Sequence, residues 1–346
     1  MKNALVLLNL GTPDAPRAPE VRRYLRQFLM DPYVIDIPGV LRWLLVHGII
    51  LRFRPKKSAE AYQKIWTDRG SPLLFHLLDL VDGVQKELDQ TEPGQWVVIP
   101  AMRYGSPSID SALQKVKNLG ITEVKVAPLY PQYSLAATQS SVAETQEAVK
   151  RVAPELQVQF LPAFYNQKLF IDAFVEVARE DLASYAFDHI LFSFHGLPER
   201  QVKKTDLTGT HCLASEGCCE RITQANQNCY RAQCFATARA MAQELGLKSE
   251  QYSVCFQSRL GRDPWIKPYT DQLYQDLPKK GVKRVAVICP AFVSDCLETL
   301  EEIRIRGRED FLHHGGEDLR LVGSLNARPG WARALTRIVL NSGAWA

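Results

Sequence analysis

The sequence predicts an α/β fold of two similar, doubly wound, Rossmann-like domains with parallel sheets. Three observations carry this prediction. The length of 346 residues, at about 150 residues per domain, indicates two domains. Apolar residues make up 46% of the chain and charged residues 23%, as in ordinary globular proteins. Short apolar runs alternate with helical patterns along the whole chain, which is typical of strands joined by helices.

Eight apolar runs have the length of strands, and most lack the polar alternation of a half-exposed sheet. They cover residues 4–8, 96–99, 123–129, 157–161, 189–194, 252–256, 283–289 and 319–322. Between them, helical patterns cover residues 71–88, 109–119, 142–152, 167–184 and 232–245. Strands that are apolar on both faces are typical of parallel sheets covered by helices on each side.

A turn at residues 151–156 divides the chain into halves with a similar order of strands and helices. We therefore expect one domain over residues 1–150 and a second over residues 151–325. The segment 329–340 is predicted to be a helix after the last strand. We expect residues 326–346 to cross back and join the first domain.

Composition excludes several classes of partner. Lys and Arg outnumber Asp and Glu by only 42 to 38, so we expect no nucleic-acid partner. The run at residues 4–8 is too short for a signal peptide and is read as a buried strand. The segment 34–51 is interrupted by polar residues and does not predict a membrane span. Neither G-x-G-x-x-G nor a Lys-Ser/Thr phosphate loop is present, so no nucleotide is expected.

Ligands of doubly wound sheets bind beyond the carboxyl ends of the strands. His195 lies at the end of the fifth run, directly before Gly196 and three residues before Pro198. A histidine there is a candidate for proton transfer or metal binding. The alternative is a turn histidine that is hydrogen-bonded to the backbone.

Two carboxylates follow the seventh run. Ser294 or Asp295 can cap a helix in which Glu298 and Glu302 share a face. Paired carboxylates in a cleft would raise at least one pKa, and they could pass protons or hold a divalent cation. The alternative is an acidic helix face exposed to solvent.

Polar and aromatic residues also follow strands of the first half. Arg103 could pair with a ligand carboxylate, whereas Tyr104, Tyr130 and Tyr133 offer flat faces to a large aromatic ligand. The alternative for each tyrosine is packing. The segment 37–51 is more apolar than an exposed helix, and Arg52, Arg54, Lys56 and Lys57 follow it. It could rest in a lipid interface, form the lip of a pocket, or be an ordinary buried helix.

Six motifs resemble those of the ferrochelatases, the terminal enzymes of heme synthesis, in family order and over nearly the whole chain. They are LNLGTP (8–13), RRYLRQFLMDPYVI (22–35), LYPQYS (129–134), SFHGLP (193–198), CFQSRLGRDPWIKP (255–268) and FVSDCLETLEE (292–302). The resemblance implies two chelatase-type domains around a central cleft. It also implies insertion of Fe²⁺ into protoporphyrin IX to form protoheme, with release of two pyrrole protons.

The resemblance also implies roles for individual residues. His195 and Glu298 match the residues that face the iron, so both are expected to be catalytic and to bind substrate Fe²⁺. Glu302 would continue the proton path, and Asp295 would support it. Cys296 stands where some relatives have histidine. The expected porphyrin-binding residues are Leu10, Tyr62, Arg103, Tyr104, Tyr130, Ser134 and Trp265. The segment 37–51 resembles the apolar lip of the family's porphyrin pocket, which suggests a cytoplasmic protein with peripheral membrane contact.

The segment 203–234 looks like an insert relative to simple bacterial relatives, and it holds five of the eight cysteines. Four thiolates suffice for a [2Fe-2S] cluster or for tetrahedral Zn²⁺. We expect a [2Fe-2S] cluster on Cys212, Cys219, Cys229 and Cys234, with Cys218 as an alternative ligand. Zinc and unliganded thiols are the alternatives. The arrangement differs from that of animal ferrochelatases, because Leu135 occupies the place of their cysteine and no cysteine lies near the C-terminus.

Two rival functions remain open. One is a chelatase for coproporphyrin III or for cobalt, against which the apolar lip argues. The other is an iron-sulfur redox or sensor protein on the same fold, in which the cysteine insert would be the working site and His195 would be dispensable.

Overall fold

The computed structural model describes residues 2–259, 261, 263–341, 343 and 345. It divides into two compact units, each described here by itself. The first comprises Met1–Tyr130, Leu135–Pro162 and Ala327–Ala346, and the second comprises Pro131–Ser134 and Ala163–Asn326. Each unit has one four-stranded parallel sheet with helices on both faces. The predicted fold class is therefore confirmed.

The first unit is built on the strand order β2-β1-β3-β4. Its strands are β1 (Asn3–Gly11), β2 (Trp96–Tyr104), β3 (Glu123–Pro128) and β4 (Gln157–Phe160). Its helices are α1 (Ala18–Met30), α2 (Gly39–Leu45), η1 (Val46–Ile50), α3 (Leu51–Ile65), α4 (Pro72–Thr91), α5 (Ile109–Asn118), η2 (Leu135–Gln139), α6 (Ser140–Val152) and α12 (Pro329–Asn341). Because β4 pairs with β3, this unit continues past the turn at residues 151–156.

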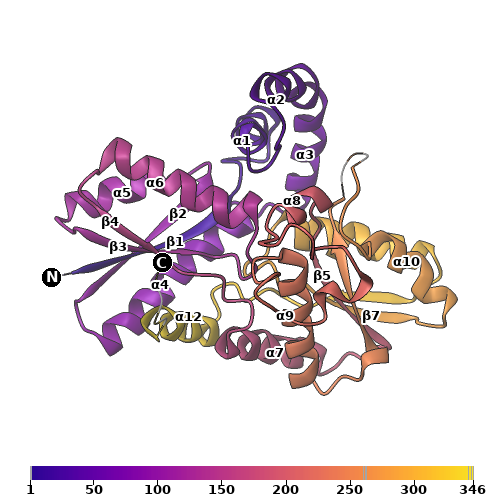
Figure 1. The fold of residues 1–346 in the computed structure, drawn as a ribbon. Coiled ribbons are helices and arrows are strands. Elements are labelled where there is room, and N and C mark those ends of the chain that lie inside the picture. Colours follow the sequence, from indigo (N-terminus) through magenta and orange to yellow (C-terminus); the bar gives the residue numbers. More distant parts are fainter. Residues whose placement is uncertain (1, 260, 262, 342, 344, 346) are drawn as a thin grey trace. The chain divides into compact units, whose positions relative to one another are not determined.

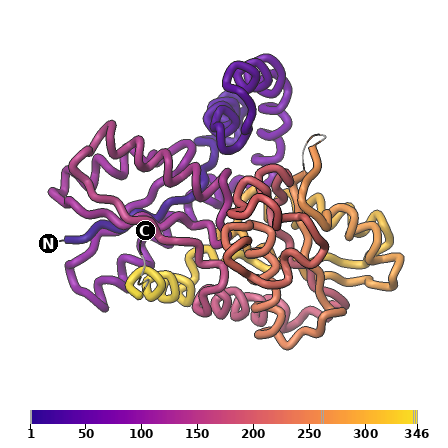
Figure 2. The backbone as a smooth tube through the Cα atoms, in the orientation of Figure 1, coloured from indigo at the N-terminus to yellow at the C-terminus, as the bar shows by residue number. Residues whose placement is uncertain are grey.

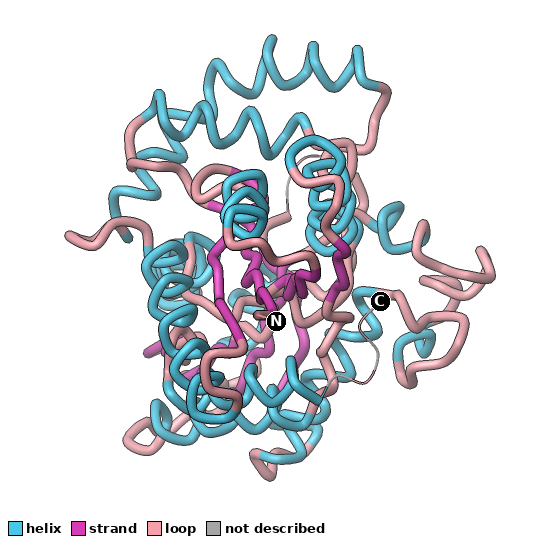
Figure 3. Tube along the Cα trace, turned by 90° about the vertical axis from the view of Figure 1, so that its left-hand side faces the viewer, coloured by secondary structure: helices cyan, strands magenta, loops and turns pink. Residues whose placement is uncertain are grey.

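Helices cover both faces of the first sheet (Figure 1). On one face, α5 and α6 pack together, and on the other α4 packs against α12. Alternate side chains of β1 point to opposite faces. Val6 and Leu8 join the core under α5 and α6, which leaves the fully buried Leu5 and Leu7 for the α4 side. Figure 3 shows the strand near the N-terminus enclosed by helices.

The second unit repeats the strand order as β6-β5-β7-β8. Its strands are β5 (His189–His195), β6 (Tyr252–Gln257), β7 (Arg284–Ile288) and β8 (Asp318–Leu321). Its helices are α7 (Lys168–Leu182), α8 (Glu199–Lys203), η3 (Glu216–Cys219), α9 (Tyr230–Glu244), η4 (Ser249–Gln251), α10 (Thr270–Lys279), η5 (Glu298–Gly307) and α11 (Arg308–His313). Between α8 and α9 the backbone forms irregular loops with one short 3₁₀ turn, η3 (Figure 2).

The first strand of each unit lies inside its sheet, between its two neighbours. In the second unit the chain leaves β5 toward β6 on one side, while β7 lies on the other. This reversal of strand order is the point where doubly wound sheets bind ligands. The end of β5 carries His195, and the segment after β7 leads to Glu298.

Candidate active site

His195 is the last residue of β5 and is partly buried. Its Nδ1 lies 2.6 Å from the carbonyl oxygen of Gly196. A carbonyl only accepts hydrogen bonds, so Nδ1 carries the proton in the neutral ring and Nε2 keeps its lone pair. The rings of Trp265 and Phe292 flank the imidazole, each with its centroid 6.4 Å away. The two interpretations of His195, a turn histidine bonded to the backbone and a proton acceptor, are therefore compatible. The hydrogen bond to the backbone uses Nδ1 and leaves Nε2 as the basic atom.

Glu298 and Glu302 lie on η5, which is a π-helix rather than the regular α-helix implied by the spacing argument. π-Helical turns are rare and occur frequently at functional sites. Glu302 accepts hydrogen bonds from the Ser258 backbone N–H at 2.8 Å and from the Ser258 hydroxyl at 2.6 Å. Burial raises the pKa of Glu302, and nearby Glu298 raises it further, whereas Ser258 and His195 lower it. The three predicted groups therefore interact electrostatically.

Asp295 is held by polar partners ahead of η5. Its two carboxylate oxygens accept from the Thr299 hydroxyl at 3.0 Å and from the Asn326 amide at 2.8 Å. The Asn326 side-chain oxygen accepts in return from the Asp295 N–H. Cys296 is buried, and its N–H donates to the Thr299 hydroxyl. In this arrangement Asp295 fixes the start of the segment that carries Glu298.

Arg103 and Tyr104, at the end of β2, share one buried carboxylate. Asp31, whose side chain is 1% exposed, accepts from Arg103 Nη2 at 2.5 Å, Tyr104 OH at 2.7 Å and Ser140 Oγ at 2.5 Å. Arg103 Nε donates to Ser140 as well. Most of the guanidinium is therefore engaged inside the first unit, and Nη1 lies 3.7 Å from Glu144. Asp31 sets the orientation of both residues.

Two of the aromatic residues predicted in the first unit, Tyr62 and Tyr104, belong to one row of ring contacts. Tyr104 packs edge-on against Phe28, which stacks on Tyr24, and Tyr24 packs edge-on against Tyr62. Tyr130 is hydrogen-bonded to Ser141, and burial raises its pKa. Leu10 is partly buried near the end of β1. Packing and ligand binding are compatible for these residues, because rings that are held rigidly by packing can also present a flat surface to a ligand.

Ser134 and Trp265 lie in the second unit. Ser134 is buried in the segment Pro131–Ser134, whose neighbours are fixed by hydrogen bonds from Gln132 to Thr237 and from the Tyr133 N–H to Gln233. Trp265 lies beside His195, and its buried indole N–H has no hydrogen-bond partner among the residues that the structure describes. An orphaned buried donor is costly in a folded protein, so Trp265 is poised to donate to a ligand.

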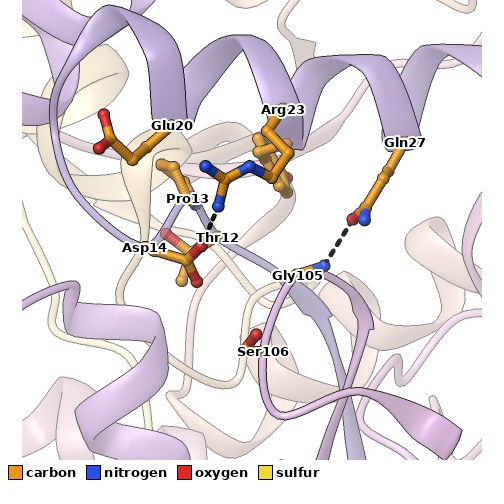
Figure 4. Close-up of a pocket in the computed structure, with 9 residues that line it drawn as sticks. Thr12, Pro13, Asp14, Glu20, Arg23, Gln27, Gly105 and Ser106 are labelled. Atoms are coloured by element: carbon orange, nitrogen blue, oxygen red, sulfur yellow. Dashed lines mark hydrogen bonds and ion pairs between the residues drawn. The ribbon is translucent and has the colours of Figure 1, made fainter.

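A small cavity of about 110 Å³ lies beyond the ends of β1 and β2 (Figure 4). It is lined by Thr12, Pro13, Asp14, Glu20, Arg23, Tyr24, Gln27, Gly105 and Ser106. Within it, Arg23 donates to Asp14, and Gln27 accepts from the Gly105 N–H. The volume is well below the roughly 300 Å³ or more of pockets for drug-sized ligands, so this cavity cannot hold a macrocycle.

All eight cysteines are free thiols, and the five in the insert are buried. The Sγ atoms of Cys218 and Cys219 are 3.6 Å apart, and the Cys229 thiol interacts electrostatically with Cys212 and Cys219. Burial raises the pKa of Cys212, Cys218 and Cys234. Among the residues described, however, no group of three or more His, Cys, Asp or Glu is arranged to hold a metal ion.

The helical segment at residues 39–65 exposes many of its apolar side chains, although Val46 and Leu51 are buried. The alternative of an ordinary buried helix is therefore wrong for α2. Helix α2 has no buried residue. The most exposed side chains are Val40 and Phe53, both at 75%, and Leu41, Trp43, Leu44 and Ile49 are also exposed. We call these six residues the apolar face. Within the described ranges, none of the helices is both long and apolar enough to cross a membrane.

Sequence reasoning overlooked four polar residues that organise these sites. Asp31, Gln257 and Ser258 lie inside quoted motifs but were assigned no role. Asn226, which is fully buried, donates to the carbonyls of Cys218 and Arg221 and accepts from the Thr223 N–H. The sequence feature that could have pointed to Asn226 is an asparagine in a loop between cysteines. Its side-chain amide can hydrogen-bond to backbone groups that have no partner in a regular helix or strand. The signal for the others is a polar residue at the end of a buried element.

The fold of the chain is shared with chelatases of known structure. SirB from Bacillus subtilis, with Fe³⁺, has the same fold, with a TM-score of 0.56 and 11% identity over 99% of this chain and 96% of SirB. A second SirB structure, from Bacillus subtilis subspecies spizizenii and in complex with cobalt, gives a TM-score of 0.52 and 11% identity over 100% of this chain and 99% of its own.

Comparison of the amino-acid sequence identifies the family. The family model described as ferrochelatase matches residues 2–342. The chain is 46% identical to the ferrochelatase of Stutzerimonas stutzeri over 97% of each chain. It is 45% identical to that of Coxiella burnetii, over 99% of this chain and 94% of the relative, and 47% identical to that of Pseudomonas fluorescens, over 97% of each. The chain belongs to the ferrochelatase family.

Proposed function

We propose that this protein inserts Fe²⁺ into protoporphyrin IX and releases the two pyrrole N–H protons. Its membership of the ferrochelatase family supports the reaction. The structural observation that carries the proposal is His195, whose Nδ1–H is committed to the Gly196 carbonyl so that Nε2 is a free base. Metal insertion needs such a base, because the porphyrin must lose two protons as it gains the metal.

His195 takes a pyrrole proton at Nε2, and Glu298 and Glu302 carry protons away along η5. Glu302 suits this role because burial raises its pKa, which brings proton uptake closer to neutral pH. Asp295 supports the path by holding the start of the segment that carries Glu298. His195 and Glu298 are also the groups proposed to receive the substrate Fe²⁺.

Seven residues are proposed to bind the porphyrin. Leu10, Tyr62, Tyr104 and Tyr130 offer apolar or aromatic contact, and Arg103 offers its Nη1 edge to a propionate. Ser134 is the polar member of the LYPQYS segment. Trp265 contributes the unpaired indole N–H beside His195. Walls that favour a bent macrocycle over the flat substrate would expose the pyrrole lone pairs to iron.

The test is an anaerobic assay of the full chain with protoporphyrin IX and Fe²⁺, in which the absorbance bands of the free base are followed. Conversion to the bands of heme is expected. Parallel reactions with coproporphyrin III and with Co²⁺ identify the preferred pair. A protein that binds porphyrin but leaves its bands unchanged with Fe²⁺ would contradict the proposal and would indicate a carrier or another metal.

We propose further that the insert holds a [2Fe-2S] cluster on Cys212, Cys219, Cys229 and Cys234, with Cys218 as an alternative ligand. The thiol chemistry fits, and the contacts of Cys229 with Cys212 and Cys219 support it. Among the described residues these thiols do not form a ligand set, so binding would have to draw them together. Such a group would stabilise the insert or sense oxidants.

Iron, sulfide and zinc analysis of freshly purified protein tests this assignment. Iron and sulfide in equal amounts, lost in Cys212→Ser and Cys229→Ser but kept in Cys255→Ala, would support the cluster. Cys255 is a buried thiol outside the insert, which makes it a matched control. Zinc in the same positions would favour the alternative site, and a metal-free protein would leave the thiols unliganded.

Finally, we propose that the protein works in the cytoplasm and touches the membrane surface through the apolar face. Basic residues accompany that face, namely Arg52, Arg54, Lys56 and Lys57 on α3. Apolar side chains with basic neighbours suit the interface of an anionic bilayer. Flotation with anionic vesicles should be lost in the double variant Trp43→Ser/Phe53→Ser and kept in Leu119→Ser, whose side chain is equally exposed elsewhere. Equal flotation of both variants would exclude this surface.

A further inference from the structure

Gln257, at the end of β6, touches both the strand that carries His195 and the helix that carries the carboxylates. Its side chain is buried, with the residue only 3% exposed. On the strand side it stands opposite His195 in the sheet register, and its carbonyl accepts from the Gly196 N–H at 2.8 Å. Its Oε1 accepts from the hydroxyl of Ser193 at 2.8 Å. Gln257 is therefore fixed to β5 by both its backbone and its side chain.

On the helix side, Gln257 Nε2 donates to the backbone carbonyl of Glu298 at 2.9 Å. The same nitrogen lies 3.5 Å from Glu302 Oε2, a longer and weaker contact. One buried amide thus joins the strand that ends in His195 to the first turn of η5. No second side chain is needed to fix the spacing between these two elements at this point.

Ser258 completes the arrangement through an unusual backbone conformation. Its φ is +67°, a left-handed conformation that is costly for a residue with a Cβ. In this conformation its N–H and hydroxyl donate to the two different oxygens of Glu302, at 2.8 and 2.6 Å. Strain of this kind persists where the surroundings demand it and is found at functional sites. Here it aims two donors at one carboxylate.

We propose that Gln257 and Ser258 are positioning residues, which together hold Glu302 and the first turn of η5 at a fixed place relative to His195. The inference rests on the proposed function, in which protons pass from His195 to these carboxylates. Proton transfer needs donor and acceptor within hydrogen-bond reach, and misplacement by about 1 Å can cost about 100-fold in rate. Neither residue has to touch the porphyrin to act in this way.

The central variant is Ser258→Gly. Glycine adopts a positive φ without strain and keeps the backbone N–H, so the substitution removes the hydroxyl together with the single carbon that carries it. The control is Ser253→Ala, which removes a hydroxyl from the same strand, where it is hydrogen-bonded to His189 at 2.9 Å. Gln257→Met removes the amide at nearly constant size. Each variant is assayed for kcat and for KM with protoporphyrin.

We expect Ser258→Gly and Gln257→Met to lower kcat by about 10- to 100-fold, with KM for protoporphyrin within about twofold of the parent. Ser253→Ala should keep the parental kcat. In a Glu302→Gln background, Ser258→Gly should cause little further loss, because residues that act through one another are not additive. An unchanged kcat in Ser258→Gly, or a full additional loss in the double variant, would overturn the proposal.

A second double-mutant cycle, on thermal stability, separates this inference from the proposed function. It uses the same Ser258→Gly and Glu302→Gln variants and needs no activity. A parent protein that inserts no metal would refute the proposed function, whereas coupled stabilities would still establish the contact. Additive stabilities would refute the contact itself. Coupled stabilities with an unchanged kcat would show that the contact is structural only, and the proposal would then be wrong.

Discussion

At the scale of single residues, one hydrogen bond decides what His195 can do. The Gly196 carbonyl accepts from Nδ1 at 2.6 Å and so directs the lone pair to Nε2. Gly196 itself cannot be replaced easily, because a Cβ there would lie 2.8 Å from the Gln257 carbonyl oxygen and 3.1 Å from the Trp265 ring. The tight turn after β5 therefore sets both the tautomer of the base and its aromatic surroundings.

The pH dependence of stability reports on Glu302. Burial raises its pKa, so the folded protein binds this proton more tightly than the unfolded chain does. The stabilising contribution is complete below the unfolded pKa of about 4.3 and is lost as pH rises through the folded value. Glutamine does not titrate, so the Tm of Glu302→Gln relative to the parent should rise between about pH 4 and pH 7. A constant or falling difference in Tm would contradict the assignment.

Asp31 and Arg103 should be strongly coupled in stability. Asp31→Asn leaves a largely buried guanidinium without its carboxylate, which typically costs about 3–5 kcal/mol. Asp31→Asn combined with Arg103→Met removes both charges, and we expect a clearly smaller loss than the sum of the two single variants. Urea unfolding of the four proteins measures this. Simple additivity would show that the ion pair does not hold the network together.

At the scale of elements, the position of the site follows from η5 and from the carboxyl ends of the strands. A π-helix is energetically poor and needs compensating contacts. Gln257 supplies one at the Glu298 carbonyl, and Ile303 supplies another by packing in the core with Phe311 and Val287. Glu298 and Glu302 therefore lie on a helix, η5, that is fixed to the sheet on one side.

The ends of β1 and β2 approach so closely that one residue must be glycine. Gly11 has φ +123°, and a Cβ there would lie 1.9 Å from the Tyr104 carbonyl oxygen. Gly11→Ala should therefore cost about 3 kcal/mol or more in the free energy of unfolding. Gly48→Ala is the matched control, since its Cβ position has no described atom within 4 Å apart from its chain neighbours and the backbone of its own helix. Chemical denaturation should separate the two, and equal stability would show that the β1 end can relax.

At the scale of the whole molecule, the sequence predicted both the alternation of strands with helices and the presence of two similar domains. All eight predicted strands form, because runs such as 4–8 and 189–194 are apolar on both faces and can only be buried in a covered sheet. The two units repeat one strand order, which the similar order of elements in the two halves indicated. His195, Glu298 and Glu302 were predicted as site residues for the same reason, since strand ends are where such folds bind ligands.

The partners of the site residues could not be predicted, because they are distant in sequence. Asp31 is 72 residues from Arg103, and Gln257 is 41 residues from Glu298. No local pattern reveals such pairs without the sheet order and register. The π-helical form of η5 also escaped prediction, because residues four apart share a face in either helix type. In the insert, irregular loops leave the cysteine spacing without a helical or strand period to interpret.

The most direct test of the central claim compares the parent with His195→Ala in one anaerobic experiment. Both proteins are titrated with protoporphyrin IX by fluorescence, and Fe²⁺ is then added while heme formation is followed. We expect both to bind porphyrin with similar affinity, and the variant to form heme about 100-fold or more slowly, as befits the loss of a general base. Heme formation at the parental rate in His195→Ala would contradict the account.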